Sequence, residues 1–394
     1  MTTGRIGNNK YLKKLNKTII LDLIRTNKGI SRKALADMTG LSPTATGQIV
    51  RALLEEEYIC EVGEDDSSGG RRPMMLELNP ASYYAFGFDI DSKYVYTVLL
   101  DITGKTCYEK KEEFENNLTP EEFITVVSKT YEQITKKLKL RNDRIIGAGI
   151  SIPGMLELPT QKILLAPNLG WSQVDIKSRL TDLLNIPVLI DNEAICSSNC
   201  EDWLGTYRDR ENFICINIDS GIGAGLFVRG AIYKGHSGSA GEIGHIPMEG
   251  NSIRCKCGKI GCLETISSVN AMVSRYKQIK DIDHDTKGYE ATLDCLINGA
   301  EAGDTACMSI FKDAAVSLGK VISYLINIFN PQEIILGKKF SQYSGFMLDE
   351  IRQTVKKTAL AYPLCNCQVL ASTFGEDSSA LGAATLPIRK LFGH

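Results

Sequence analysis

The spacing of hydrophobic and polar residues predicts a small helical unit at the start of the chain. Apolar side chains recur at helical spacing in residues 18–26, and a second short helix begins after Ser31 and ends at Gly40. Ser42, which is followed by a proline, marks the start of a third helix that runs to about Glu57. Three short helices with a tight glycine turn between the last two predict a helix-turn-helix.

Two short alternating segments follow these helices. Residues 58–62 and 74–78 alternate apolar and polar side chains as strands do, and the loop between them ends in Gly69-Gly70-Arg71-Arg72-Pro73. A strand pair of this kind after a helix-turn-helix is a wing. We therefore expect a winged helix-turn-helix over residues 10–80, preceded by a flexible terminus at residues 1–9.

The predicted third helix and wing offer side chains suited to DNA contacts. In a winged helix the third helix enters the major groove, and arginines at the wing tip reach a narrow minor groove. A winged helix can also serve purely for protein contacts. The candidate DNA-binding residues are Ser42, Thr44, Thr46, Gln48, Arg51, Arg71 and Arg72, and those on the helix after Ser42 are expected to be exposed.

The distribution of charge supports the DNA-binding interpretation. Residues 1–54 contain ten Lys or Arg and two Asp, a net charge of +8, although the whole chain carries only −2, so the rest carries −10. A basic end attached to an acidic body indicates a polyanion-binding module joined to a domain with another task. The plainer alternative is a solvated basic arm, and the helix-turn-helix pattern argues against it.

Length and composition fit a globular protein of two or three folding units. The chain has 394 residues, of which 43% are hydrophobic and 23% charged, and this profile excludes collagen-like, disordered and disulfide-stapled classes. The first residues show no export signal, and the longest apolar stretch, Val321–Phe329, is too short for a bilayer span. We therefore expect a cytoplasmic protein with no membrane partner.

The remaining residues predict a duplicated α/β body. An apolar strand, a tight turn and a second strand start at Tyr84, and the same order returns at Phe213. Both copies carry Ile-Asp-Ser at the turn, as residues 90–92 and 218–220. Strands and helices alternate after each copy, so we expect two similar lobes with a cleft between them.

A cluster of cysteines gives the sharpest chemical signal. Cys255, Cys257 and Cys262 fall within eight positions beside glycine turns, and His245 lies ten residues before the first of them. Three thiolates and one imidazole complete a closed tetrahedral shell, which is typical of structural zinc. Unligated cysteines are the alternative. The pair at residues 365 and 367 has no further ligands nearby and is interpreted as incidental.

Two acidic residues flank this cluster. Glu242 lies three residues before His245, and Glu264 lies two residues after Cys262. Their carboxylates can accept hydrogen bonds from sugar hydroxyls while the imidazole holds a metal with one nitrogen and a ligand with the other. Spacing alone leaves the alternative open that both are solvated loop acids.

These motifs together resemble those of the ROK family (repressors, open reading frames and kinases), specifically its winged-helix sugar repressors of the xylose, N-acetylglucosamine and glucose type. The resemblance rests on the helix-turn-helix, the wing, the stretch from Ile218 to His245, and the CxCGxxGCLE pattern that starts at Cys255. It implies a two-lobed body of the actin and hexokinase (ribonuclease H-like) type. The implied division places this body at residues 81–394, with lobe one at about 81–190 plus the helix at 378–394 and lobe two at about 191–377.

The resemblance also implies a ligand site and an assembly. A sugar or sugar derivative would bind in the interlobe cleft, Zn²⁺ would have a structural role on His245, Cys255, Cys257 and Cys262, and the chain would form homodimers or tetramers. The implied sugar-binding residues are Gly154, Asn168, Asn192, Glu193, Glu242, His245 and Glu264.

The chain departs from the kinases of this family at four positions. Where the kinases have Asp-x-Gly-Gly-Thr in the first hairpin, residues 89–93 read DIDSK, which removes the glycines and adds a carboxylate. The Gly-Thr of the second phosphate loop is Asp219-Ser220 here, and the adenine-side Gly-Gly is Gly337-Lys338. Glu193 replaces the catalytic Asp, and its extra methylene moves the carboxylate by about 1 Å. This shift can prevent in-line attack of the sugar hydroxyl on phosphate, while the carboxylate still accepts a hydrogen bond from the sugar.

The sequence thus predicts a non-enzymatic regulator with no catalytic residues. We expect a sugar-responsive repressor that binds operator DNA and is released when sugar binding closes the lobes and changes the spacing of two winged helices. The main alternative is an ATP-dependent ROK sugar kinase with a DNA-binding head. A third alternative is a zinc or redox sensor, which a closed shell of three cysteines and a histidine disfavours.

Overall fold

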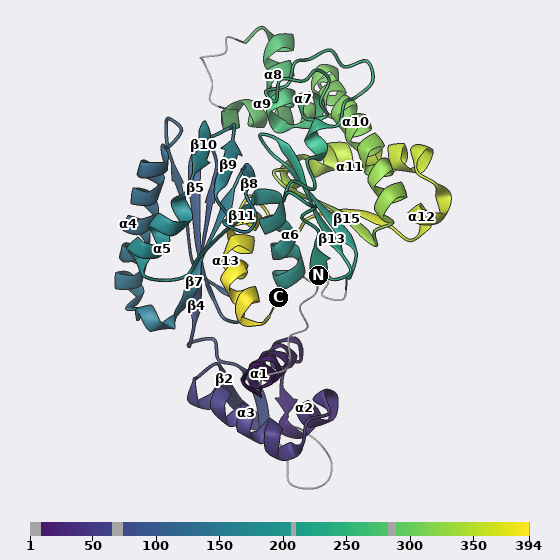
Figure 1. The fold of residues 1–394 in the computed structure, drawn as a ribbon. Helices are drawn as coiled ribbons and strands as arrows, with labels where there is room; N and C mark the ends of the chain where they lie inside the picture. Colours follow the sequence, from purple (N-terminus) through teal and green to yellow (C-terminus); the bar gives the residue numbers. More distant parts are fainter. Residues whose placement is uncertain (1–8, 65–73, 206–209, 283–288, 394) are drawn as a thin grey trace.

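The head of the molecule folds as a winged helix-turn-helix. The computed structural model describes residues 9–64, 74–205, 210–282 and 289–393. The head contains α1 (Asn9–Thr26), β1 (Ile30–Ser31), α2 (Arg32–Thr39), α3 (Pro43–Glu55), β2 (Ile59–Glu64) and β3 (Met74–Leu78). The strands form one antiparallel sheet in the order β1-β3-β2, so the expected strand pair gains a third strand from the residues just before α2 (Figure 1).

Local capping sets the ends of the head helices. The hydroxyl of Ser31 accepts a hydrogen bond from the backbone amide of Ala34 at 3.2 Å, and that of Ser42 accepts one from Ala45 at 3.2 Å. Gly40 ends α2 with a φ of 68°, a left-handed conformation that glycine adopts without strain. The signals seen in the sequence therefore operate as expected, although α3 ends two residues earlier than predicted.

The first lobe of the body is built on a five-stranded sheet in the order β11-β7-β4-β5-β6. Phe86 and Phe88 point to the face covered by α4 (Pro120–Leu138) and α5 (Ile176–Leu184). Gly87, between them, points to the other face, where α13 (Ser378–Leu391) packs so closely that a Cβ would meet its backbone. The strands are β4 (Tyr84–Ile90), β5 (Tyr94–Asp101), β6 (Thr106–Glu113), β7 (Ile145–Ile152) and β11 (Val188–Asn192).

The second lobe is built on a sheet in the order β14-β13-β12-β15-β16. Its largest apolar cluster lies under the helices α8 to α11, and α6 (Glu193–Leu204) packs on β12 and β13. The strands are β12 (Phe213–Ile218), β13 (Ile222–Val228), β14 (Ala231–Ile232), β15 (Glu333–Lys338) and β16 (Gln368–Ala371). The helices are α7 (Glu264–Ser267), α8 (Val269–Lys280), α9 (Tyr289–Glu301), α10 (Thr305–Phe329), α11 (Phe340–Thr358) and α12 (Ala361–Cys365).

The two large sheets have the same topology. In each, the first strand in the chain (β4 or β12) pairs antiparallel with the second, and the second pairs antiparallel with the third. The first strand also pairs parallel with a later strand, which pairs parallel with the last. This repetition confirms the internal duplication expected from the two Ile-Asp-Ser turns. The strand β6 was not expected, because its sequence TCYEKKEE is mostly polar. Such a sequence is typical of an edge strand, and β6 lies at the edge of its sheet.

Short elements complete the body. A small antiparallel sheet in the order β10-β9-β8 follows β7, and two 3₁₀ turns accompany the larger elements. These elements are β8 (Met155–Leu156), β9 (Ile163–Ala166), β10 (Trp171–Val174), η1 (Asn142–Arg144) and η2 (Ile243–His245).

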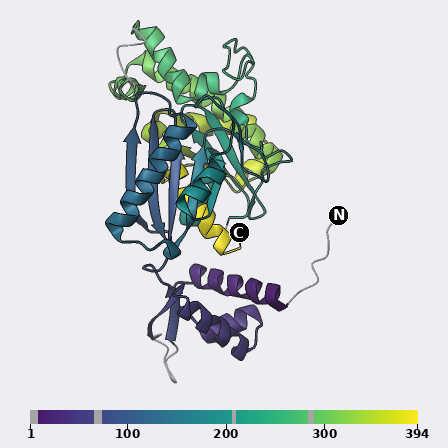
Figure 2. The ribbon, with the colours of Figure 1, turned by 60° about the vertical axis from the view of Figure 1, so that its left-hand side comes forward.

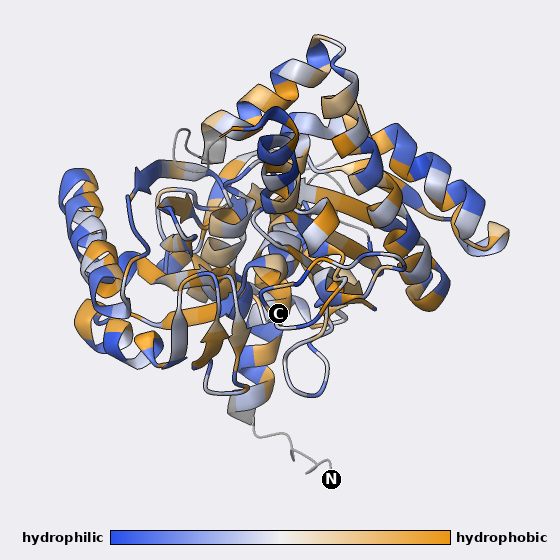
Figure 3. Ribbon diagram, turned by 90° about the horizontal axis from the view of Figure 1, so that it is seen from above, coloured by the Kyte–Doolittle hydropathy of each residue, from blue (hydrophilic) through white to orange (hydrophobic). Residues whose placement is uncertain are grey.

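Apolar residues concentrate along the central strands, while the surrounding helices carry both apolar and polar faces (Figure 3). This distribution is that of amphipathic helices packed on buried sheets. Among the helices of the described residues, none combines the length and apolar character needed to cross a bilayer.

Candidate functional site

A cavity of 590 Å³ lies between the two lobes. Its walls come from the segments after β7 and β9, the start of α6, the turn between β12 and β13, and the loops around η2 and α7. The structure brings all seven sugar-binding candidates of the sequence to this cavity, namely Gly154, Asn168, Asn192, Glu193, Glu242, His245 and Glu264.

The start of α6 forms one wall of the cavity. Asn192 caps the helix, because its Oδ1 accepts a hydrogen bond from the amide of Ala194 at 2.8 Å. The same side chain donates from Nδ2 to the carbonyl of Gly154 at 2.9 Å, which ties α6 to the segment after β7. A Cβ at Gly154 would press on the backbone of Leu165 and Ala166, so only glycine allows this close approach.

Glu193 is the first residue of α6 and has an unusual electrostatic environment. Burial raises the pKa of its carboxyl to about 8, an effect that the ammonium of Lys338 opposes and that the acids Asp89, Asp219 and Asp91 reinforce. At neutral pH the carboxyl is therefore mostly protonated. A protonated carboxyl can donate as well as accept a hydrogen bond, which suits it to a sugar hydroxyl.

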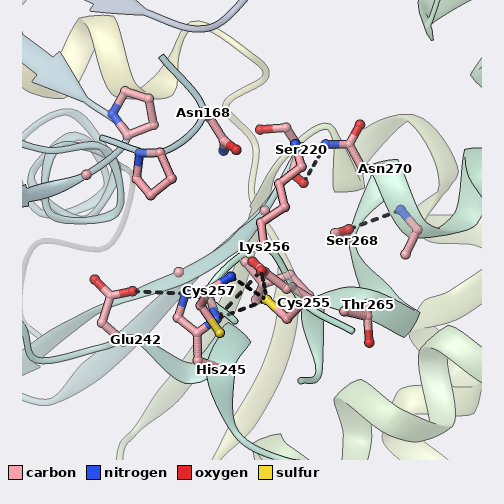
Figure 4. Close-up of a pocket in the computed structure, with 18 of the residues that line it drawn as sticks. Asn168, Ser220, Glu242, His245, Cys255, Lys256, Cys257, Thr265, Ser268 and Asn270 are labelled. Carbon is pink, nitrogen blue, oxygen red and sulfur yellow. Dashed lines mark hydrogen bonds and ion pairs between the residues drawn. The ribbon is translucent and has the colours of Figure 1, made fainter. Parts of the chain in front are cut away.

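The four expected metal ligands lie together, and His245, Cys255 and Cys257 also line the cavity. The ligand atoms of His245, Cys255, Cys257 and Cys262 all fall within 4.8 Å of one another. Figure 4 shows the first three of these residues. Cys255 Sγ lies 3.7 Å from His245 Nδ1, and Cys257 Sγ lies 3.7 Å from Cys262 Sγ. Tight backbone turns at Gly258 and Gly261, with φ of 91° and 86°, fold the loop around the cluster.

The geometry of this cluster fits a tetrahedral metal ion. With Zn–S bonds of about 2.3 Å, the ligand atoms of a tetrahedron lie about 3.8 Å apart, which matches the two 3.7 Å separations. The cluster can therefore hold a metal with no open position. Cys365 is exposed and is not part of any group of three or more potential ligands within the described residues, in keeping with its interpretation as incidental.

The imidazole of His245 has two different neighbours. Its Nδ1 faces Cys255 and lies 3.6 Å from Glu264 Oε1, whereas its Nε2 lies 3.9 Å from Glu242 Oε2 (Figure 4). One ring nitrogen therefore belongs to the metal cluster, and the other points toward an acid of the cavity. Glu264 is 21% exposed and contacts the cluster at Cys255 and His245, so it is not a solvated loop acid, whereas Glu242 is 42% exposed and that interpretation stays open for it.

A second cavity of 650 Å³ adjoins the first and shares some of its walls. The residues that line both are Asn168, Ser220, Lys256 and Asn270. The remaining walls include Asp91, Ser92, Asp219 and Lys339, which belong to the segments that depart from the kinase pattern. Asp219 Oδ1 lies 3.8 Å from Lys339 Nζ, and burial raises the pKa of Asp219 to about 7 although that lysine lowers it.

A buried ion pair joins the two large sheets. Lys338 Nζ lies 2.8 Å from Asp89 Oδ2, and each side chain is 1% exposed. Ser151 donates a hydrogen bond to the other carboxylate oxygen at 2.5 Å. Burial alone would lower the pKa of Lys338, but the charge of Asp89 raises it, so the ammonium stays charged.

The head exposes four of the DNA-binding candidates. Ser42, Thr44, Gln48 and Arg51 lie on the outer side of α3. Thr46 was expected to be exposed, but this is wrong, because its side chain is 1% exposed and occupies the same helix face as the core residues Val50 and Leu53. The candidates Arg71 and Arg72 lie outside the described residues.

The contact between head and body was not predicted from the sequence. The guanidinium of Arg25 on α1 lies 3.8 Å from the ring centroid of Trp203 at the end of α6, and Phe392 meets the same indole edge-on at 5.4 Å. Tyr83 stacks on Tyr58 of the head at 4.4 Å. The seam lies where α1 rests against the lower end of the body (Figure 2). The one feature of the sequence that could have drawn attention to Trp203 is that the chain has just two tryptophans.

Known proteins share both parts of this architecture. A sequence profile of the ROK family matches residues 85–390, and one of winged helix-turn-helix DNA-binding domains matches residues 10–59. The chain belongs to the ROK family. The xylose repressor of Bacillus subtilis strain 168 is 30% identical to this ROK chain over 383 residues, which cover 97% of each protein.

Solved structures extend the comparison to the fold of the ROK chain. A ROK family transcriptional regulator described as a homolog of the Escherichia coli MLC protein is 23% identical, with a TM-score of 0.83 and coverage of 97% of both chains. A ROK family glucokinase from Streptomyces griseus, solved with glucose and AMPPNP, is 23% identical with a TM-score of 0.67, and the match covers 77% of this chain and 98% of that one. The body thus has the fold of sugar kinases, as expected.

Proposed function

We propose that this protein is a sugar-responsive, DNA-binding transcriptional regulator, a repressor of a carbohydrate-utilisation operon that leaves its operator when a sugar binds between the lobes. The observation that carries the proposal is the path of α6. Its first residue, Glu193, lines the interlobe cavity, and Trp203 near its other end contacts the head. One rigid helix therefore touches both the ligand site and the DNA-binding domain.

The packing around α6 supports its role as the link. Gly382 of α13 lies against the backbone of Cys196, and Gly225 of β13 lies against Ser198, with no space for a Cβ at either glycine. Close-packed surfaces of this kind transmit displacement because they have little room to deform. A ligand that moves the start of α6 would therefore move Trp203 and, through it, Arg25 on α1.

The proposed roles of the remaining residues follow from where they lie. Exposed Thr44, Gln48 and Arg51 would contact operator DNA, with Ser42 at the helix start and Arg71 and Arg72 in the wing. The seven candidates that line the cavity would hold the sugar. Zn²⁺ on the cluster of three cysteines and a histidine would fix the loop that carries Glu264, a structural rather than a chemical contribution.

We also propose the division into units expected above, with the head at residues 10–80, the first lobe at about 81–190 plus 378–394 and the second at about 191–377. A winged-helix repressor reads two half-sites as a symmetric pair, so we propose that the protein acts as a homodimer or tetramer. Closure of the lobes would then change the spacing of the two heads.

Kinase activity is not part of the proposed function. In a kinase the segments after the first strands of both lobes cradle phosphates with free backbone amides. Here Asp91 directs its backbone amide to the carbonyl of Tyr94 at 2.9 Å, and Lys338 is committed to Asp89 in a buried pair. The named repressor relative, which matches along the full chain, supports the same conclusion.

The proposal is tested by DNA binding with and without sugar. An operator is selected from random DNA by the purified, zinc-loaded protein, and its affinity is measured by fluorescence anisotropy against a panel of sugars and sugar phosphates. We expect one member of the panel to weaken binding at least tenfold. Glu242→Ala should bind the operator normally and lose the response, whereas Glu249→Ala, an exposed acid on the same segment outside the cavity, should keep it.

Two further measurements separate the alternatives. Conversion of sugar and ATP to sugar phosphate and ADP would identify the kinase, and binding that a chelator reverses while no sugar affects it would identify a metal sensor. Arg25→Ala tests the link through α6. It should keep both sugar and DNA affinity and reduce the effect of one on the other, and full retention of the response would show that α6 is not the route.

A further inference from the structure

The interlobe cavity contains a lysine that the proposed sugar-binding set does not use. Lys256 lies between the metal-cluster residues Cys255 and Cys257, and it lines both the first and the second cavity (Figure 4). The neighbouring backbone is held by tight hydrogen bonds, from Cys255 N to the carbonyl of Lys259 at 2.8 Å and from Gly258 N to that of Cys255 at 3.0 Å. The metal loop therefore holds the base of Lys256 at the junction of the two cavities.

Lys256 differs from the other cations near the cavities in having no protein partner among the described residues. Lys339 faces Asp219 at 3.8 Å, Lys111 faces Glu376 at 2.9 Å, and Arg275 faces Asp313 at 2.7 Å. The ammonium of Lys256 makes no such ion pair or hydrogen bond within the described ranges. A cation at a cavity junction without an internal anion is available to a ligand.

Other donors at the junction are also available. Asn168 and Ser220 line both cavities with Lys256, and their side-chain groups make no hydrogen bond to the described residues. Asn270 donates to the backbone carbonyl of Ser220 at 2.8 Å, which fixes this turn in place. An ammonium, an amide and a hydroxyl together match the oxygens of one anionic group.

The second cavity, which the junction opens into, carries cations as well as acids. Asp219 Oδ1 lies 3.8 Å from Lys339 Nζ, and Asp91 Oδ1 accepts a hydrogen bond from Ser92 at 2.9 Å. The acids that line this cavity are matched in number by its lysines, which are Lys93, Lys111, Lys256 and Lys339. An anion at Lys256 would therefore not enter a site with a net negative charge.

We infer that the effector is an anionic sugar derivative, whose ring occupies the first cavity and whose charged group binds Lys256, Asn168 and Ser220 at the junction with the second. The shared chemistry is a sugar that carries a phosphate or a carboxylate. This inference rests on the proposed function and makes Lys256 the residue that selects charged over neutral sugars.

The test compares neutral and anionic sugars on matched variants. Isothermal titration of the zinc-loaded, full-length protein uses glucose, N-acetylglucosamine and xylose, the 6-phosphates of the first two, and glucuronate as the carboxylate arm. We expect an anionic member to bind more tightly than its neutral parent. Lys256→Gln should weaken that member roughly 10- to 100-fold, the usual value of a charged hydrogen bond, and leave the neutral parent within about twofold.

Lys259→Gln is the matched control, because Lys259 is exposed on the same loop, as Lys256 is, but lines neither cavity. The zinc content of both variants is measured to show that the loop is intact. Equal or tighter binding of a neutral sugar, or an anionic preference that Lys256→Gln leaves unchanged, would overturn the inference and keep the proposed function. Failure of every sugar to bind would instead contradict the proposed function itself.

Discussion

Lys338 at the end of β15 and Asp89 near the end of β4 form a buried ion pair that joins the two large sheets, with 2.8 Å between Nζ and Oδ2. The two residues are 249 positions apart in the chain. A pair with both members 1% exposed is sensitive to the loss of one partner, because the remaining charge stays buried without compensation.

We therefore expect Lys338→Met to lower the free energy of unfolding by about 3–5 kcal/mol. The double variant Lys338→Met with Asp89→Asn should recover part of this loss, because no uncompensated charge remains. Urea unfolding measures both, and Lys356→Met, at an exposed position on α11, should change stability by less than about 0.5 kcal/mol. Equal losses in the single and double variants would show that the ion pair is not the cause.

The exposed and buried positions of α3 predict different effects on DNA binding. Gln48→Ala should weaken operator binding by about 1–3 kcal/mol and relax the preference for one base, whereas Arg51→Ala should weaken binding to all sequences and reduce its salt dependence. Thr46→Val should leave base preference unchanged, because this side chain is 1% exposed. Selection of binding sites from random DNA by each variant measures all three. A changed consensus for Thr46→Val would contradict the buried position.

Removal of the metal should destabilise the body and leave the head folded. We expect Cys257→Ser to lose bound zinc, which is measured by elemental analysis, and to lower Tm by roughly 5–10 °C. Cys365→Ser, which changes an exposed cysteine outside the cluster, should keep one zinc per chain and the original Tm. Equal zinc content in the two variants would contradict the proposed zinc site.

The raised pKa of Glu193 predicts a pH-dependent stability. A carboxyl with a pKa of about 8 in the folded protein, above its ordinary value of 4.5, contributes stability that is complete below pH 4.5 and is lost as the pH rises through 8. Over that interval each pH unit costs at most about 1.4 kcal/mol. Glu193→Gln removes this titration, so the variant should gain stability relative to the wild type between pH 5 and pH 8.

Urea unfolding of both proteins at several pH values measures this difference. The charges of Asp89, Asp91, Asp219 and Lys338 act on Glu193 and are present in both proteins, so only the difference between the two proteins reports on position 193. A constant difference from pH 5 to pH 8 would show that the carboxyl is ionised throughout.

Local signals explain which parts of the fold could be predicted from the sequence. The caps at Ser31 and Ser42, the glycine turn at Gly40 and the repeated Ile-Asp-Ser turns all act within a few residues, so the helices, the wing and the duplication were visible. The closely spaced cysteines revealed the metal cluster for the same reason. Glu242, His245 and Glu264 were found from the same short stretch, and the family resemblance supplied the other four cavity residues, which no spacing rule could have brought together from such distant segments.

Long-range contacts account for what was missed. Thr46 lies on a short polar stretch, and only the packing of α3 against the head core decides that its side chain points inward. The contact of Arg25 with Trp203 and the pairing of Lys338 with Asp89 each join residues more than 170 positions apart, where a single sequence carries no periodic signal. In the sequence, Lys338 was interpreted only as the loss of a glycine of the kinase pattern. The structure shows that its ammonium also forms an ion pair with Asp89.

The position of α13 has a consequence for synthesis of the protein. This helix, residues 378–391, covers one face of the first sheet, and Phe392 just after it supports the indole against which α1 rests. The first lobe therefore leaves the ribosome with one face of its sheet uncovered, because nearly two hundred residues separate the end of its last strand at Asn192 from the start of α13 at Ser378. A chain that stops before residue 378 has every residue of the DNA-binding head and lacks Ile388 and Phe392, which are part of the surface that packs with α1, so early termination would yield a DNA-binding fragment with a weakened link to the body.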